Sequence, residues 1–272
     1  MDRLPLLNHP LDEPTAFTPE ALLDAVRAAR GLAAEPPPEV CVLDFDGDLT
    51  DWMVAEGRAR PWMSWACFHT TMFSLQVEGI PYGIVPRTIG GPYAVLVAEQ
   101  LAASGGRLIL GLTSAGRVLR SLPLPSLVVA TSAMRDEGTS YHYLPPGESI
   151  GAPRGIPDWI ESELRRLDFP VARGMVWTTD APYRETRQQL NRYAAAGVLA
   201  VEMQAASLFS FAVRHEFPVG VVAHVTNAVD HSDDPFDKGA QMESVRILEA
   251  MCKAGRQFLD SRAGRSGIHR QE

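Results

Sequence analysis

The stretch that decides the fold is GVLAVEMQAASLFSFAVRHEFPVGVVAHVTNAVD, residues 197–230. Its apolar residues predict a short strand over 198–201 and a helix over 203–215 that is buried on most sides. After Pro218, a continuous apolar run over 219–225 predicts an internal parallel strand. The strand–helix–strand order indicates an α/β protein.

Polar residues interrupt this apolar stretch at its two joints. Glu202 and Gln204 follow the first strand, and Thr226 and Asn227 end the second strand. Open α/β sheets bind ligands at the carboxyl ends of their strands. We therefore expect both joints to face a ligand.

Length and composition predict one α/β domain with short appendages. The chain has 272 residues, and 46% of them are hydrophobic, which is ample for a full core. We expect an N-terminal arm and helix over 1–38, a main domain over 39–262 and a flexible tail over 263–272. Within the first segment, Thr18 is expected to cap a helix and Gly31 to end it.

Charge and cysteine content exclude several classes of partner. The formal net charge is −8 and the isoelectric point is about 5.4, which argues against nucleic acid or an anionic membrane surface. No signal peptide and no apolar run of spanning length are apparent. The three cysteines have no metal-ligand spacing, so we expect reduced thiols, a cytoplasmic location and no metal.

Four segments resemble the nucleoside phosphorylase and nucleosidase superfamily, which includes uridine phosphorylase. VEMQAASLF at 201–209 resembles the family segment VEMEAA, and the Gly-rich turn at 87–92 resembles the family turn GIGGPS. RDEGTSYHY at 135–143 and TTDAPYRE at 178–185 resemble family segments that follow later strands. The resemblance implies a single three-layer αβα domain whose central mixed sheet is partly barrel-like.

The resemblance also implies the site residues. Gln204 stands where the family has a Glu that binds the ribose hydroxyls and stabilises positive charge. Asn227 stands where purine-specific relatives have a catalytic Asp, which favours a pyrimidine base. The expected substrate-binding residues are Glu202, Met203, Tyr183, Arg184, His142 and His9, the last from an arm that crosses to a neighbouring subunit in the family. The expected phosphate-binding residues are Gly47, Thr113, Ser114 and Arg87.

The activity that the resemblance implies is phosphorolysis of a uridine-like nucleoside to free base and pentose 1-phosphate. Inorganic phosphate would be the co-substrate, with no cofactor, in a homo-oligomer that is a dimer or a hexamer. However, Asp51 and Leu110 stand where the family has phosphate-binding arginines. Hydrolysis by water, or a nucleoside-binding protein with weakened catalysis, is therefore the alternative on the same fold.

The segment EVCVLDFDGDLTD at 39–51 permits another interpretation. It resembles the first motif of haloacid-dehalogenase-like phosphatases, in which Asp44 would be the nucleophile and Asp46 the acid/base beside Mg²⁺. That interpretation also uses Thr113 or Ser114, with Asp233 and Asp234 as metal-binding acids. The segments that follow favour the phosphorylase-like loop at Gly47.

Overall fold

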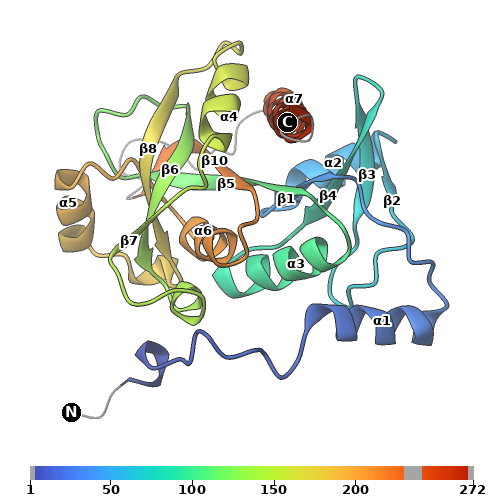
Figure 1. Ribbon diagram of the computed structural model, residues 1–272. Coiled ribbons are helices and arrows are strands. Elements are labelled where there is room, and N and C mark those ends of the chain that lie inside the picture. Colours follow the sequence, from blue (N-terminus) through green and yellow to red (C-terminus); the bar gives the residue numbers. More distant parts are fainter. Residues whose placement is uncertain (1–3, 230–240, 269–272) are drawn as a thin grey trace.

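The computed structural model describes residues 4–229 and 241–268, with side chains to residue 264. Ten strands of this part of the chain form one mixed sheet in the order β10-β6-β8-β9-β5-β1-β4-β3-β2, with β7 paired to β6 (Figure 1). The strands are β1 Val40–Asp44, β2 Ala59–Pro61, β3 Phe73–Val77, β4 Ile80–Pro86, β5 Leu108–Arg117, β6 Ser126–Asp136, β7 Ser149–Gly151, β8 Val171–Thr179, β9 Ala200–Glu202 and β10 Val219–Ala228. The helices are α1 Pro19–Arg30, α2 Asp48–Ala55, α3 Gly91–Ala103, α4 Ile156–Leu164, α5 Arg187–Ala195, α6 Ala205–Arg214 and α7 Gln241–Ile268, and the 3-10 turns are η1 Pro5–Leu7, η2 Thr139–His142 and η3 Pro182–Arg184.

Part of the sheet closes on itself. Strand β10 pairs with β6 on one edge and with β5 on the other, so β10, β6, β8, β9 and β5 form a ring. Strands β1, β4, β3 and β2 extend the sheet away from β5. This arrangement confirms the expected mixed, partly barrel-like sheet.

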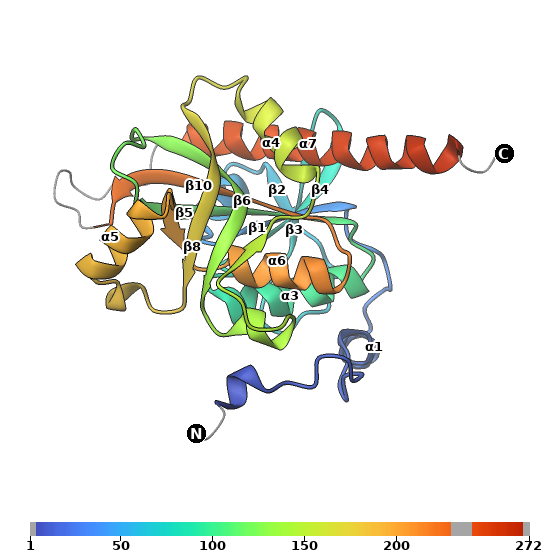
Figure 2. The same cartoon turned by 60° about the vertical axis from the view of Figure 1, so that its left-hand side comes forward.

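Helices cover the sheet on both faces (Figures 1 and 2). Helices α3 and α6 pack side by side on one face, and α2, α4 and α7 lie on the other. Each face has its own apolar core, one that includes Phe209 and Phe211 of α6 and one that includes Met251 and Phe258 of α7. None of the described helices combines the length and apolar composition that crossing a membrane requires.

The deciding stretch folds as strand, helix and strand. Its helix, α6, is buried at every position from Ala205 to Ala212, because the sheet lies on one side and α3 on another. Strand β10 runs parallel to β5 but antiparallel to β6, so it is internal to a mixed sheet. The predicted burial of both elements is confirmed.

The ends of two helices test the local sequence signals. Helix α1 begins where expected, since the Thr18 hydroxyl accepts a hydrogen bond from the amide of Ala21, and Gly31 ends it with φ of 63°. Helix α7 continues to Ile268. The helix thus extends beyond residue 262, where the main domain was expected to end, and the flexibility of the tail stays a prediction.

Candidate active site

Glu202 is the anchor of the joint between β9 and α6. Its side chain is 4% exposed, and Oε2 accepts hydrogen bonds from the amides of Gln204 at 2.6 Å and Ala205 at 2.8 Å. Oε1 accepts from the Thr178 hydroxyl at 2.5 Å. Burial raises the pKa of Glu202 to about 7, with the hydrogen bonds acting in the opposite direction. Both carboxylate oxygens are thus used to hold the start of α6, which positions Met203 and Gln204.

Gln204, which follows β9 directly, and Thr113, in the middle of β5, lie together. The Gln204 side chain is 1% exposed, and its Oε1 accepts from the amide of Met203 at 3.1 Å and from the Thr113 hydroxyl at 3.5 Å. The Thr113 hydroxyl also approaches the carbonyl of Ser114 at 2.7 Å. The fold therefore brings together one residue expected at the sugar and two expected at phosphate.

Asn227 lies further along the same ring of strands. It pairs with Gly116 of β5, and Gly116 in turn pairs with Val201, the residue before Glu202. The Asn227 amide donates to the Thr226 hydroxyl at 2.8 Å, and the residue is 9% exposed. Asn227 thus lies on the ring of strands that includes β9, with β5 between the two.

The loop after β1 contains the expected phosphate-binding glycine. Gly47 has φ of 87°, and a Cβ there would stand 2.6 Å from Cγ of Arg87, so the position requires glycine. Arg87 itself has φ of 59°, and its guanidinium forms an ion pair with Asp51. The loop and Arg87 are therefore in contact, as the phosphate interpretation requires, but the cation is neutralised by Asp51.

Two aspartates, one at the end of β1 and one in the loop that follows, accept hydrogen bonds from backbone amides. Asp44 accepts from the amide of Gly47 at 3.2 Å and from the amide and hydroxyl of Thr50 at 2.8 and 2.7 Å. Burial raises the pKa of Asp44. Asp46 Oδ2 accepts from the amide of Ser114 at 3.1 Å. These contacts begin α2 and connect it to β5.

The phosphatase interpretation requires Asp44 to be a free nucleophile, and the structure does not favour this. Asp44 is 4% exposed, and the start of α2 uses both of its oxygens. Among the described residues, no cluster of three His, Cys, Asp or Glu side chains is arranged to hold a metal. The expected acids Asp233 and Asp234 lie outside the described residues.

The N-terminal arm lies against its own chain. The His9 ring stacks on His142 with centroids 4.0 Å apart and planes tilted by 35°. Arg214 of α6 holds the arm through the carbonyl of Leu11 and an ion pair with Asp12. Burial, and secondarily the neighbouring His9, lowers the pKa of His142. The two histidines expected at the substrate are thus brought together within one chain.

Tyr183 and Arg184 lie on the surface. They form the exposed turn η3, and Tyr183 is 99% exposed. Among the described residues, no hydrogen bond joins either side chain to another expected site residue. Their role in base binding stays a prediction.

Several residues that sequence reasoning missed support the site. Thr178, which donates to Glu202, also accepts from the amide of Ala206 at 2.9 Å. Glu137 accepts from the Ser207 hydroxyl at 2.6 Å and from the amide of Ser140, which ties α6 to η2. Both acceptors lie within the family-like segments, but their partners on β9 and α6 are distant in sequence, so no local pattern indicates those contacts.

Two further arginines of β5 and β6 are used structurally. Arg135 is buried and donates to the Ser140 hydroxyl and to the carbonyls of Leu144 and Pro145. Arg117 donates to the carbonyl of Leu122. Leu110, in place of a family arginine, is buried in the core.

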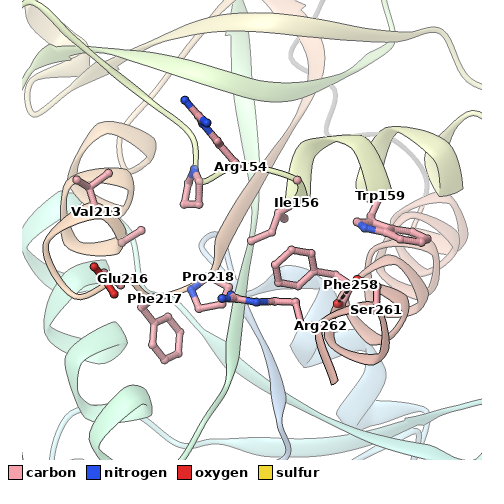
Figure 3. A pocket seen from close by; sticks show the side chains of 13 residues that line it. Arg154, Ile156, Trp159, Val213, Glu216, Phe217, Pro218, Phe258, Ser261 and Arg262 are labelled. Carbon is pink, nitrogen blue, oxygen red and sulfur yellow. Dashed lines mark hydrogen bonds between the residues drawn. The ribbon is translucent and has the colours of Figure 1, made fainter. Parts of the chain in front are cut away.

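Two cavities differ in their relation to these residues. The larger one, about 590 Å³, opens between α4, the end of α6 and α7, and Figure 3 shows side chains such as Trp159, Phe217 and Phe258 around it. It lies at the amino end of β10 and contains none of the expected site residues. The smaller one, about 50 Å³, lies beyond the carboxyl end of β1 and is lined by Asp46, Thr113 and Ser114, together with His224 and residues of α7. Thr113 and Ser114, two of the residues expected at phosphate, thus line this cavity, whereas Gln204 lies outside it.

Comparison with known proteins identifies the family. The model of the phosphorylase superfamily matches residues 49–259. A guanosine phosphorylase from Halorubrum lacusprofundi is 29% identical over 153 residues, which cover 54% of this chain and 61% of that relative. A uridine phosphorylase from Thermococcus kodakarensis is 26% identical, covering 65% of this chain and 68% of the relative. The uridine phosphorylase of Escherichia coli is 20% identical, covering 70% and 80%. Because the family match spans most of the chain, this protein belongs to the phosphorylase superfamily.

Proposed function

We propose that this protein cleaves the N-glycosidic bond of a nucleoside by phosphorolysis, releasing the free base and a pentose 1-phosphate. The observation that carries the proposal is the β9–α6 joint, where buried Glu202 fixes Gln204 against Thr113 of β5. The matched relatives are nucleoside phosphorylases, which supports this type of reaction.

In this proposal, Gln204 binds the sugar. As the glycosidic bond breaks, the sugar becomes oxocarbenium-like and gains positive charge. The Gln204 amide hydrogen-bonds ribose hydroxyls, but it lacks the charge of a carboxylate, and electrostatic contributions of this kind are worth about 2.7–4 kcal/mol. We therefore propose slow turnover or a changed substrate.

The acceptor approaches from the opposite side of the sugar. Thr113, Ser114 and the Gly47 loop provide hydroxyl and backbone donors beyond the carboxyl end of β1, and Arg87 lies beside this loop. Inorganic phosphate is the proposed co-substrate, and no organic cofactor is required. Hydrolysis is the second candidate, because Asp46 already occupies one of these donors.

A uridine-like base is favoured by Asn227, whose neutral amide can hydrogen-bond a base carbonyl but cannot protonate a purine. The relatives include guanosine and uridine phosphorylases, so the base is a matter for experiment. We also propose a homo-oligomer, dimer or hexamer, which light scattering on the purified protein tests. A cytoplasmic location stays a prediction.

The activity test incubates the protein with purine and pyrimidine nucleosides, with and without phosphate, and measures free base and sugar products by chromatography. Phosphate-dependent release of uracil with pentose 1-phosphate is the expected result. Binding of nucleosides without release of any base would overturn the proposal in favour of a binding protein. Magnesium-dependent release of phosphate from a phosphomonoester would overturn it in favour of a phosphatase.

A further inference from the structure

Beyond the carboxyl end of β1, a backbone amide of the neighbouring strand β5 has no partner in the described part of the sheet on that side. Strands β1 and β5 pair up to Asp44 opposite Leu112, where β1 ends, while β5 continues to Arg117. The amide of Phe45 donates to the carbonyl of Leu112, and the next amide of β5 at this edge is that of Ser114. This amide therefore points into the space above β1, where the proposed acceptor binds.

The chain supplies its own anion at that amide. Asp46 Oδ2 accepts from the Ser114 amide at 3.1 Å, in the manner in which a phosphate oxygen would. The nearby amides of Gly47 and Thr50 are likewise taken, both by the carboxylate of Asp44. An incoming oxyanion therefore meets amides that already have carboxylate partners.

The charge and the size of the cavity at this position both disfavour phosphate relative to water. Asp44, Asp46 and Asp48 line the small cavity at Ser114 together with one histidine, His224, and its volume of about 50 Å³ has room for a few water molecules. The nearby cation, Arg87, is paired with Asp51. A multiply charged phosphate is repelled by this surrounding, whereas neutral water is not.

We propose that Asp46 is an intramolecular competitor for the acceptor-phosphate position at Ser114, so that phosphate binds weakly there and water can compete with it as the acceptor. The inference rests on the proposed function. When water is the acceptor, its oxygen bonds to the anomeric carbon, the carbon–nitrogen bond breaks, and its electron pair leaves with the base. The proton that water loses passes to the solvent or to the base, and the products are the free pentose and the free base. Phosphate reacts only when it displaces the Asp46 carboxylate.

The test measures binding of inorganic phosphate to the full-length protein by calorimetry, independently of turnover. We compare the wild type with Asp46→Asn, which removes the charge but keeps the shape, and Asp46→Ala, which frees the Ser114 amide. Both variants should bind phosphate with a dissociation constant lowered by about 10-fold or more, since a nearby like charge is removed. Asp24→Asn, which removes the same charge from an exposed position of α1, should stay within twofold of the wild type.

The partition of products provides a second readout. At a fixed phosphate concentration, both Asp46 variants should give a larger fraction of pentose 1-phosphate relative to free pentose. Unchanged or weaker phosphate binding in both folded variants, including no measurable binding, would overturn the proposal. If no variant cleaves any nucleoside, the proposed function fails, but the calorimetry still decides whether Asp46 competes with phosphate.

Discussion

Replacing Glu202 with alanine tests the anchor on which the site depends. The carboxylate accepts from the amides of Gln204 and Ala205 and from the Thr178 hydroxyl, all within a region that is nearly inaccessible to water. Glu202→Ala leaves these three donors unpaired. An unsatisfied buried donor costs about 1–3 kcal/mol, so we expect a loss of about 3–5 kcal/mol in the free energy of unfolding.

Glu202→Gln separates the shape of this side chain from its charge. Burial raises the pKa of folded Glu202 to about 7, from a reference value of 4.5. Between these two values the folded state binds more protons than the unfolded state, so the free energy of unfolding contributed by this group falls as pH rises. A shift of this size corresponds to about 3 kcal/mol across that interval, and Glu202→Gln should abolish that part of the pH dependence.

Urea denaturation of the wild type and both variants at pH 5 and pH 8 provides the measurement. Glu20→Ala, an exposed acidic position in the first turn of α1, is the control and should change the free energy of unfolding by less than about 1 kcal/mol. A loss below 1 kcal/mol for Glu202→Ala, or a pH dependence of Glu202→Gln equal to that of the wild type, would refute the reasoning.

Three further predictions concern the acceptor and sugar sides of the site. Gln204→Glu should raise kcat for nucleoside cleavage by up to about 100-fold, because a carboxylate stabilises the oxocarbenium; steady-state kinetics showing no gain would contradict this role. Asp51→Asn should lower the KM for phosphate by releasing Arg87, while costing less than about 1 kcal/mol of stability because the ion pair is exposed; an unchanged KM would argue against Arg87 as a phosphate ligand. Gly47→Ala should cost about 1–3 kcal/mol, since φ is 87° and the added methyl group would meet Arg87, and a melting temperature equal to that of the wild type would exclude this strain.

Local signals predicted much of the fold. Thr18 and Gly31 mark the ends of α1 because an N-cap hydroxyl and a left-handed glycine act within a few residues. The apolar run of β10 and the all-round apolar surface of α6 predicted burial because hydrophobic periodicity reports directly on exposure to solvent. The extension of α7 to Ile268 was missed, since its polar last turns have no core-facing pattern.

The candidate site was predicted in part. Gln204 and Thr113 lie together, and Gly47 contacts Arg87, as the motifs implied. The stacking of His9 on His142 was not predicted, because the path of an N-terminal arm is determined by where it docks rather than by its own residues.

The sequence by itself determined the order of strands and helices, the burial of the deciding stretch and the family. Only the tertiary structure decided which polar groups meet, because hydrogen bonds such as Ser114 to Asp46, 68 residues apart, and Ala206 to Thr178, 28 residues apart, depend on how a loop and a helix pack against the strands. This packing places these donors and acceptors within 3.1 Å of each other, and no local sequence pattern contains that distance.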